Sequence, residues 1–454
     1  MARSRTIRLA RGFVIAAPRS GSGKTLVTLG LIAALKARGL DVAPAKTGPD
    51  YIDTAILARV AGREAVNLDP WAMRPERLRT LAGVNADLLV VEGVMGLFDG
   101  AADGTGSTGD LAELLGLPVV LVVDAERMSQ SVAPLIAGFT EWRPALTTAG
   151  VILNRVASQT HEDMLLRAIE PLGIPVLGAI PRRETLALPS RHLGLVLPGE
   201  SADFDAVVAA ATDAVAKYVD LDSLLSGLPS PLRGGDGGGG PSMDHRTTPT
   251  LDPSPQGGGK LPPLGQRIAI ARDDAFGFVY PHWLSDWRAA GAEVSFFSPL
   301  ADEAPDEGAD AVFLPGGYPE LHGGRLAAAA NFKVGLAAAR DRGALIYGEC
   351  GGFMVLGQTL TDKDGSTHQM AGLLRLDTEM TKKPMLGYRR LSHESPLPWP
   401  RELNGHEFHY STMRLTGQPV LFESADALGV KRAPMGVVQG RVMGSYAHVI
   451  DVAG

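Results

Sequence analysis

A segment of 39 residues, from 227 to 265, divides the chain of 454 residues into two parts. Eleven of its residues are glycine and eight are proline, and it contains no aromatic side chain. This composition has no apolar periodicity, so it predicts a flexible tether that packs into no element. We therefore expect two domains, residues 1–226 and 266–454, joined by a linker over residues 227–265.

The first part alternates short β-rich apolar runs with amphipathic stretches. Such alternation predicts a doubly wound α/β domain, in which a mostly parallel sheet binds its ligands at the carboxyl ends of the strands. The expected strands are Gly12–Ala17, Leu88–Glu92, Val119–Asp124, Gly150–Asn154 and Ile174–Ile180, and the expected helices include Lys24–Arg38, Gly109–Leu115 and Gln130–Phe139.

The second part shows the same alternation of β-rich runs and amphipathic stretches, which predicts a second α/β domain. Beyond about residue 365 the alternation weakens, and we expect several short strands there in place of long helices. The clearer expected strands are Arg267–Ala271, Glu293–Phe297, Ala311–Leu314 and Ala344–Tyr347.

A phosphate-binding loop is predicted directly after the first strand. In such a loop, backbone N–H groups and a helix N-terminus surround the phosphates, a lysine reaches their oxygens, and a threonine binds Mg²⁺. The order of strand, loop and helix is present here, although Pro18 replaces the first glycine of the general motif. The residues expected to bind ATP are Ser20, Gly21, Ser22, Gly23, Lys24 and Thr25.

Carboxylates for the Mg²⁺ that accompanies ATP are expected at the ends of neighbouring strands. Glu92 ends an apolar run, and Asp99 lies in the glycine-rich turn that follows it. Each also has a structural interpretation, because Glu92 fits a cap of the next turn and Asp99 fits an acceptor of local backbone N–H groups. Our predicted metal ligands are Thr25, Glu92, Asp50 and Asp99.

The segment KTGPDYID, residues 46–53, brings a cation and two further carboxylates to the expected end of another strand. Asp50 and Asp53 are candidates to complete the Mg²⁺ site, and Lys46 is a candidate to bind an anionic substrate. A competing interpretation is an aspartate-rich turn that opens a helix at Thr54, with Asp53 as the N-cap. The residue types alone leave both interpretations open.

Cys350 follows a β-rich run in a tight turn and precedes a pair of glycines. This order is typical of a nucleophile elbow, which places a reactive atom beside backbone N–H groups and a helix N-terminus. The segment PGGYPE, residues 315–320, is the expected source of an oxyanion hole. A buried core cysteine is the competing interpretation, and spacing does not choose the base among His406, His409 and His448.

Composition excludes several other classes of protein. The net charge of −7 argues against a dominant nucleic-acid surface, which needs clustered Lys and Arg. A single cysteine forms no internal disulfide, and no apolar run approaches the roughly 20 residues that cross a bilayer. We therefore expect a cytoplasmic enzyme that binds neither nucleic acid nor membrane.

Together the motifs make the sequence similar to the corrinoid-pathway a,c-diamide synthases, which are glutamine-dependent amidotransferases. The similarity covers essentially the whole chain apart from the linker. It rests on the motifs SGSGKT (20–25), KTGPDYID (46–53), NLDPWAM (67–73), VVEGVMGLFDG (90–100), PSRHLGLV (189–196), PGGYPEL (315–321), YGECGGFMVLG (347–357), GHEFHYS (405–411) and GSYAHV (444–449).

The resemblance implies an N-terminal amidoligase domain like dethiobiotin synthetase and a C-terminal class I glutaminase domain. It implies Cys350 as the nucleophile and His448 as its base, and the residues expected at the oxyanion and the glutamine are Gly316, Gly317 and Gly351. Related cobyric acid synthases carry Gln-Asn-Met where this chain has Gly48-Pro49-Asp50. This difference favours a,c-amidation.

The implied reaction is the amidation of the a and c carboxylates of hydrogenobyrinic or cobyrinic acid in cobalamin biosynthesis. ATP and Mg²⁺ activate each carboxylate as an acyl phosphate, and ammonia released from L-glutamine displaces the phosphate. Because free ammonia becomes ammonium in water, we expect the domains to dock around a closed passage. Candidate substrate contacts are Lys46, Tyr51, Ile52, Asp53, Arg191 and His192.

Two departures and two alternatives accompany the resemblance. Many class I glutaminases carry a glutamate two residues after the histidine, where this chain has Ile450, and Asp451 is one residue out of register. A Cys–His dyad is therefore plausible. The alternatives are a Ni-sirohydrochlorin a,c-diamide synthase and a partition-type ATPase, whose signature lysine corresponds to Arg19. A homodimer is expected by resemblance to dethiobiotin synthetase.

Overall fold

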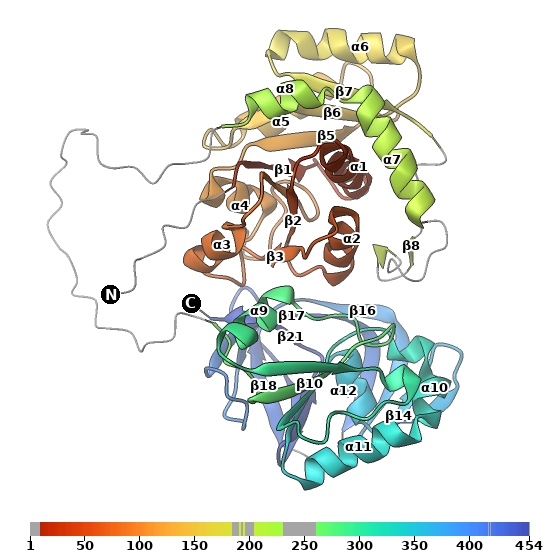
Figure 1. Ribbon diagram of the computed structural model, residues 1–454. Helices are drawn as coiled ribbons and strands as arrows, with labels where there is room; N and C mark the ends of the chain where they lie inside the picture. The colour runs from red at the N-terminus through yellow and green to blue at the C-terminus, as the bar shows by residue number, and fades with distance from the viewer. Residues whose placement is uncertain are drawn as a thin grey trace, which may run out of the picture.

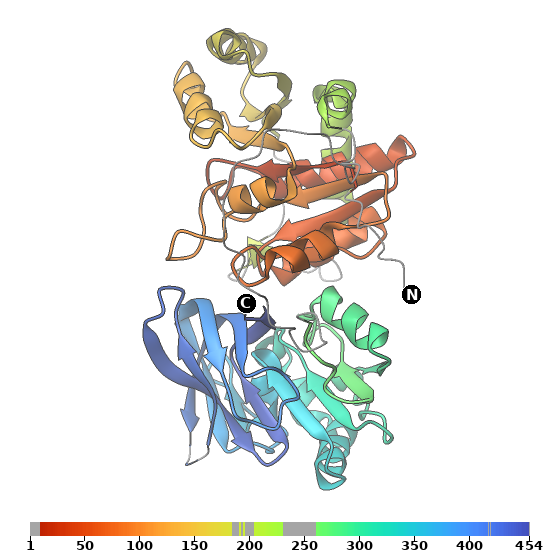
Figure 2. The same cartoon turned by 90° about the vertical axis from the view of Figure 1, so that its left-hand side faces the viewer.

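The computed structural model describes residues 10–183, 190–191, 194–195, 204–229, 260–415, 417 and 419–453. Two α/β halves lie one above the other, with the N-terminal half uppermost in Figure 1. Each half contains its own large sheet, as the side view in Figure 2 also shows.

In the described part of the N-terminal half, seven strands form a parallel sheet in the order β3-β2-β4-β1-β5-β6-β7. Along β1, Phe13 and Ile15 pack into one apolar cluster while Val14 and Ala16 pack into another. Both faces of the sheet are thus covered, which explains its continuous apolar runs. The strands are β1 (Gly12–Ala16), β2 (Val42–Thr47), β3 (Val66–Leu68), β4 (Leu88–Glu92), β5 (Val119–Asp124), β6 (Thr148–Val156) and β7 (Val176–Pro181).

Helices flank this sheet, and the doubly wound fold expected from the sequence is confirmed. A separate pair of two-residue strands, β8 (Ser190–Arg191) and β9 (Gly194–Leu195), precedes the last two helices. The helices are α1 (Lys24–Ala37), α2 (Tyr51–Ala61), α3 (Pro75–Ala82), α4 (Thr108–Leu115), α5 (Val132–Glu141), α6 (Gln159–Ile169), α7 (Phe204–Tyr218) and α8 (Leu221–Gly227).

The described C-terminal half has a mixed sheet of twelve strands, which is parallel from β11 through β20 and antiparallel over most of the remainder. Two of the strands are much longer than the short strands we expected there. The strands are β10 (Arg267–Ala271), β11 (Glu293–Phe297), β12 (Ala311–Leu314), β13 (Leu345–Glu349), β14 (Thr359–Thr361), β15 (Thr367–Gln369), β16 (Leu376–Ser392), β17 (Glu402–Leu415), β18 (Val420–Ala425), β19 (Lys431–Gln439), β20 (Val442–Ser445) and β21 (His448–Val452).

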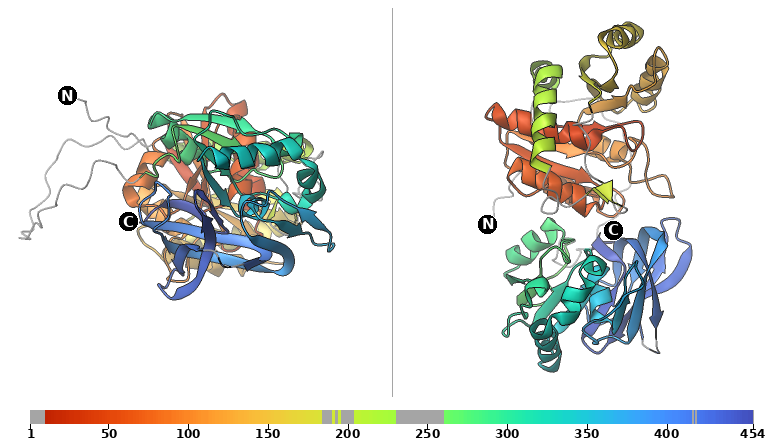
Figure 3. Two further views of the ribbon diagram at one scale, coloured as in Figure 1. Left: turned by 90° about the horizontal axis from the view of Figure 1, so that it is seen from below. Right: turned by 90° about the vertical axis from the view of Figure 1, so that its right-hand side faces the viewer.

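Helices α9, α11 and α12 pack against the parallel part of this sheet and α10 lies against β15, while Figure 3 shows the antiparallel strands forming a separate wall beside the helices. No described helix is both long and apolar enough to span a membrane. The helices are α9 (Pro281–Ala289), α10 (Gly323–Ala328), α11 (Ala330–Asp341) and α12 (Gly351–Leu356), and short 3₁₀ turns cover Glu170–Leu172, Pro299–Ala301 and Pro319–Leu321.

The two halves contact each other through α2, α3 and the end of β3 on one side and α9, β16, β17 and β21 on the other. Trp71 stacks on Tyr388 with ring centroids 4.4 Å apart, and the Tyr388 hydroxyl donates to Asp69 at 3.0 Å. Arg77 of α3 pairs with Asp286 of α9 and, at 3.4 Å, with Asp451 of β21. The two halves are therefore docked against each other in the described part of the chain.

Both ends of the glycine- and proline-rich segment are packed, which corrects the expectation that none of it packs. Leu228, Leu261 and Leu264 are buried, and the Trp399 indole donates to the Pro262 carbonyl at 3.0 Å. Apolar leucines at the ends of the segment supply the burial that its glycines lack. Residues 230–259 lie outside the described part of the chain.

Candidate functional site

The predicted phosphate-binding loop lies between β1 and α1, at the carboxyl end of the sheet. Gly21 and Gly23 adopt φ values of 80° and 91°, which favour glycine. A Cβ on Gly23 would lie 2.2 Å from Nδ2 of Asn154, and that amide donates to the Ser22 carbonyl at 2.9 Å. Asn154, which the motif analysis missed, therefore holds the loop from the end of β6.

Lys24 begins α1, and its ammonium donates to the backbone carbonyl of Met95. Burial, together with the nearby charge of Lys46, lowers the pKa of Lys24 to about 8. Met95 lies in the turn after β4 with a positive φ of 48°. The lysine is thus directed across the loop toward the turn that follows Glu92.

Glu92 lies at the end of β4 and is fully buried. The Thr25 hydroxyl donates to its Oε1 at 2.6 Å, and Lys46 Nζ lies 3.0 Å from the same oxygen. Lys46 also pairs with Asp53 at 2.5 Å, and these two carboxylates raise the pKa of Lys46 against the lowering effect of its burial. Threonine, glutamate, lysine and aspartate therefore form one buried cluster beside the loop.

The donors of this cluster fit a Mg²⁺ ion. Oε2 of Glu92 is buried without a hydrogen-bond partner among the described residues, and Thr25 lies beside it. The described residues contain no group of three or more His, Cys, Asp or Glu side chains arranged to bind a metal. Proteins usually bind Mg²⁺ through one or two of their own groups, and phosphate oxygens and water complete the coordination.

The other two predicted metal ligands make local hydrogen bonds. Asp50 is the N-cap of α2, with its Oδ1 accepting from the Asp53 N–H at 2.9 Å, so the helix begins at Tyr51 and our alternative of Asp53 as the cap is wrong. Burial, with the Asp53 charge, raises the pKa of Asp50 to about 7. Asp99 accepts from the Gly96 N–H at 2.8 Å, the local role that competed with a metal-binding one.

Cys350 occupies a strained turn between β13 and α12. Its φ of 46° and ψ of −105° are unusual for a residue with a side chain, and such a conformation costs on the order of 1–3 kcal/mol. A Cβ on Gly316 would lie 3.3 Å from the Cβ of Cys350, and a Cβ on Gly351 would lie 3.1 Å from the backbone nitrogen of Gly317. The three glycines predicted to surround the oxyanion therefore gather around the thiol.

His448 begins β21 and faces the same turn. A Cβ on Gly316 would lie 2.4 Å from Cε1 of the imidazole. Burial disfavours the charged ring, but interactions with Cys350 and Glu349 raise the pKa of His448 to about 9. Nδ1 lies 3.7 Å from Oε2 of Glu349. Of the three candidate histidines, His448 is the one that interacts with the thiol.

The other two histidines lie beside this pair. The His406 ring stacks on His448 with a centroid distance of 5.0 Å, and its Nε2 lies 3.2 Å from the Tyr280 hydroxyl. Burial, together with His448, lowers the pKa of His406 well below its ordinary value. His409 stacks on Tyr446 and lies 3.5 Å from Glu407, so it belongs to a neighbouring wall.

Tyr51, at the first turn of α2, reaches across to the C-terminal half. Its hydroxyl lies 3.3 Å from Nδ1 of His448, and its ring stacks on Phe278 and Tyr280. The Tyr280 hydroxyl donates in turn to the Pro49 carbonyl at 3.4 Å. The segment 46–53 thus connects the buried cluster around Glu92 with the histidine of the other half.

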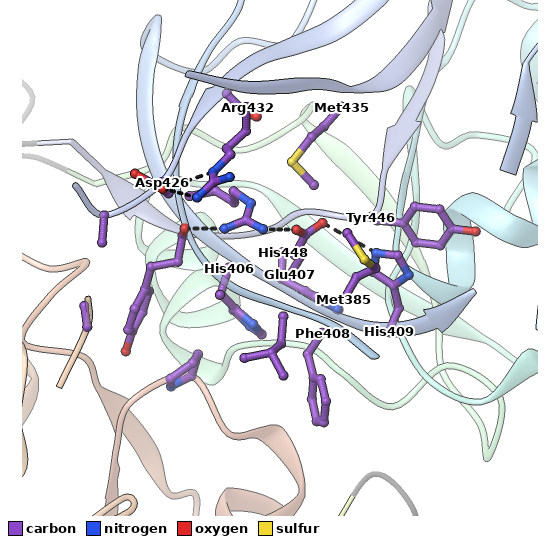
Figure 4. Close-up of a pocket in the computed structure, with 18 of the residues that line it drawn as sticks. Met385, His406, Glu407, Phe408, His409, Asp426, Arg432, Met435, Tyr446 and His448 are labelled. Carbon is purple, nitrogen blue, oxygen red and sulfur yellow. Dashed lines mark hydrogen bonds and ion pairs between the residues drawn. The ribbon is translucent and has the colours of Figure 1, made fainter. Parts of the chain in front are cut away.

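A cavity of about 1320 Å³ lies between the halves. It is lined by Asp50, Tyr51 and Ile52 from α2 and its cap, by the turns after β4, and by strands β16 to β19 with His448. Figure 4 shows one side of this cavity, where Arg432 pairs with Asp426 and Glu407 lies beside His409. Sequence reasoning missed this β-strand wall, because Arg389 and Arg432 lie in no motif and Glu407, although inside GHEFHYS, was given no role.

Two predicted substrate residues are not placed against this cavity. The backbone of Arg191 belongs to β8, but its side chain lies outside the described part of the structure, as does all of His192. Lys46 and Asp53 pair with each other beside Glu92 and are not among the residues that line the cavity. The structure therefore brings together the phosphate-binding loop, Glu92 and Asp53 beside it, Tyr51, and the pair of Cys350 and His448. The roles of these residues remain predictions.

Two known protein families match this chain, one in each half. Residues 13–196 match the CobQ/CobB/MinD/ParA nucleotide binding domain. Residues 267–452 match the CobB/CobQ-like glutamine amidotransferase domain. An ATP-binding half and a glutamine-using half are therefore joined in one chain.

Full-length relatives share this arrangement. A hydrogenobyrinate a,c-diamide synthase of Brucella anthropi is 50% identical over 450 residues, which cover 98% of this chain and 99% of the relative. Proteins with the same name from Rhizobium meliloti and Rhodobacter capsulatus are 48% and 49% identical, over 97% of this chain and 99% and 98% of their own lengths. With such identity over nearly its whole length, this chain belongs to the hydrogenobyrinate a,c-diamide synthase family of ATP-dependent glutamine amidotransferases.

Proposed function

We propose that this protein amidates the a and c side-chain carboxylates of hydrogenobyrinic acid, using ATP and L-glutamine. The observation that carries the proposal is the 3.3 Å contact between the Tyr51 hydroxyl and Nδ1 of His448. It joins the segment beside the phosphate-binding loop to the predicted glutaminase base. Tyr51 and His448 also line the same cavity, which supports a transfer of ammonia between the two halves.

In the glutaminase half, the Cys350 thiolate attacks the side-chain amide of glutamine, and His448 accepts the thiol proton. The backbone N–H groups near Gly317 and Gly351 stabilise the oxyanion of the tetrahedral intermediate. His448 then protonates the departing ammonia, and water hydrolyses the thioester to release glutamate. The raised pKa of His448 favours the imidazolium form that donates this proton.

In the other half, the loop from Ser20 to Thr25 binds ATP, and a substrate carboxylate attacks the γ-phosphate. The ionised carboxylate is a poor acceptor of ammonia, whereas its acyl phosphate has a good leaving group. We assign Mg²⁺ to Thr25 and Glu92; when bound, it supplies positive charge to the phosphates. Lys24 stabilises the charge that develops on the transferred phosphoryl group.

The cavity between the halves is suited to a flat, polycarboxylate macrocycle. Its volume of about 1320 Å³ exceeds that of ordinary small-molecule sites, and its lining is mainly apolar. Arg389 and Arg432, which pair with Glu407 and Asp426, supply cations on the strand wall. We propose that the macrocycle lies between this wall and Tyr51, with one carboxylate directed toward the phosphate-binding loop.

The domain limits and cellular context are part of the same proposal. Residues 1–226 act as the amidoligase domain and residues 266–454 as the glutaminase domain, connected through residues 227–265. The enzyme works in the cytoplasm as a homodimer. Light scattering of the purified protein tests the dimer, and a monomeric mass at working concentrations would contradict it.

The decisive test of the function is direct conversion. The purified protein is incubated with ATP, Mg²⁺, glutamine and either hydrogenobyrinic acid, cobyrinic acid or Ni-sirohydrochlorin, and the products are followed by mass spectrometry. We expect mono- and then diamidation of hydrogenobyrinic acid. Selective amidation of Ni-sirohydrochlorin, or ATP hydrolysis that is indifferent to macrocycle and glutamine, would overturn the proposal.

A further inference from the structure

Two groups face Nδ1 of His448, and only one of them carries a full charge. Oε2 of Glu349 lies 3.7 Å away, and the Tyr51 hydroxyl lies 3.3 Å away. A histidine that serves as a base needs a partner on its second nitrogen, which fixes the tautomer and stabilises the charged ring. A carboxylate does both, whereas a neutral hydroxyl contributes no charge.

Burial and hydrogen bonds fix the position of the Glu349 side chain. It ends β13, immediately before Cys350, and is 1% exposed. Its Oε1 accepts hydrogen bonds from the Tyr347 hydroxyl at 3.0 Å and from the Val449 N–H at 3.1 Å. Since both donors bind Oε1, the second oxygen remains directed at the imidazole.

The two residues near the usual sequence position of the carboxylate partner, Ile450 and Asp451, make other contacts. Ile450, at the position where many class I glutaminases carry glutamate, is fully buried, and its carbonyl accepts hydrogen bonds from the His282 and Trp283 rings. Asp451 pairs with Arg77 of the other half at 3.4 Å. Neither side chain reaches His448 in the described contacts.

We propose that Glu349 is the positioning carboxylate of the glutaminase site, so that Cys350, His448 and Glu349 act as a triad whose acid precedes the nucleophile. This inference rests on the proposed glutaminase roles of Cys350 and His448. The Glu349 carboxylate, 3.7 Å from Nδ1, favours a proton on that nitrogen and leaves Nε2 free to accept the proton of the thiol. After that transfer, the carboxylate stabilises the imidazolium ring beside the thiolate.

The charge balance of the site agrees with this assignment. Burial lowers the pKa of His448, yet Cys350 and Glu349 outweigh burial and raise that pKa to about 9. Removing the carboxylate charge therefore lowers the pKa of His448. With a lower pKa, the His448 ring is protonated less often and therefore stabilises the Cys350 thiolate less.

The test compares Glu349→Gln with the matched carboxylate-to-amide change Asp451→Asn. A glutamine at 349 keeps the acceptor for Val449 but presents an N–H group to Nδ1, which favours the wrong tautomer. We expect glutamine hydrolysis to fall by about 100-fold or more through kcat, with ammonia-dependent amidation retained. Glu349→Asp should recover part of the lost rate.

A second readout follows the thiol itself. Cys350 is the chain's single cysteine, so its alkylation by iodoacetamide can be measured as a function of pH without background. We expect the alkylation profile of Glu349→Gln to move to higher pH than that of the wild type. The profile of Asp451→Asn should not move.

Each other outcome has a definite meaning. If the wild type hydrolyses glutamine and Glu349→Gln does so equally well with an unchanged alkylation profile, Glu349 has no positioning role. Loss of ammonia-dependent amidation in Glu349→Gln would show a general structural role and would also overturn the inference. If the wild type hydrolyses no glutamine, the proposed function itself fails.

Discussion

The hydroxyl of Tyr51 lies 3.3 Å from Nδ1 of His448, although the two residues belong to different halves of the protein. Tyr51 also lines the cavity between the halves and follows Asp50, the N-cap of α2. A ligand that moves this tyrosine therefore changes the surroundings of His448, the base that we propose for the glutaminase reaction. Coupling between substrate binding and ammonia release can operate through this one contact.

Tyr51→Phe tests that coupling. The substitution keeps the ring stacked on Phe278 and Tyr280 but removes the hydroxyl. Because one hydrogen bond is lost, we expect glutamine hydrolysed per amide formed to rise by about 2- to 10-fold. The ratio of glutamate to amidated product measures this, with Tyr218→Phe on α7 as the control. An unchanged ratio would contradict the coupling.

Cys350→Ala separates the two nitrogen sources. Without the thiol no thioester forms, so we expect glutamine-dependent amidation to fall by more than about 10³-fold. Amidation with an ammonium salt at high pH should persist, because the ATP site is untouched. Product formation from each source is followed by mass spectrometry, and loss of both activities would show that the thiol has been assigned wrongly.

Lys24→Ala should impair the ATP-dependent reaction and spare glutamine hydrolysis, the reverse of Cys350→Ala. Lys24 begins α1 at the predicted phosphate-binding loop and carries the charge nearest to the γ-phosphate in our assignment. We expect amidation from either nitrogen source to fall by at least about 10²-fold, while glutamine hydrolysis remains measurable. The two rates are assayed separately, and an intact amidation rate would exclude the loop from catalysis.

The five strands that we listed for the N-terminal sheet could be predicted from sequence because they are mainly buried apolar runs, whereas the short β3 was not predicted. The expected Leu88–Glu92 and Val119–Asp124 coincide with β4 and β5. The start of α2 was displaced because two aspartates compete for its cap, and only the folded backbone shows that Asp50 accepts from Asp53. Caps depend on local geometry that residue type leaves undecided.

The long strands of the C-terminal half were harder to recognise. β16 extends over 17 residues, but its pairing with β17 is interrupted by a register shift between Met380 and Met385. Several of its residues face the cavity or solvent, which breaks the simple alternation of apolar and polar residues. A sequence pattern reports burial on one face and does not reveal a cavity that forms between two halves.

The surroundings of the thiol were predicted in part. The glycine segments and Cys350 could be identified as neighbours because strand ends of a parallel sheet meet at one edge. The proximity of Glu349 and His448 could not, since it depends on the pairing of β13 with β20 and on the path of the chain into β21. The contact of Tyr51 depends on docking of the halves.

A pH dependence of stability is expected from Asp69, a fully buried carboxylate at the interface. Burial raises its pKa to about 6, against hydrogen bonds from Ala72, Tyr388 and Trp71. Since the folded pKa lies above the unfolded value, its contribution to stability is complete below about pH 4 and is lost as the pH rises through 6.

Asp69→Asn should remove this dependence. We expect the wild-type free energy of unfolding to fall relative to that of the variant by up to about 1.4 kcal/mol per pH unit between pH 4 and 6. Denaturant titrations at several pH values measure the difference, with the exposed Asp364→Asn as the control. A constant difference across this range would contradict the raised pKa.

Gly316→Ala tests the geometry around the thiol most directly. A Cβ at this position would lie 2.4 Å from Cε1 of His448, closer than nonbonded carbon atoms approach, so the imidazole must move. A displacement of this kind can reduce a rate by about 10²-fold, because proton transfer depends on alignment. We expect glutamine hydrolysis to fall by that factor while ammonia-dependent amidation is retained. Gly324→Ala is the matched control, since a Cβ there meets no atom within 4 Å. Equal glutaminase rates in the two variants would show that the position of His448 near Gly316 is not needed for the reaction.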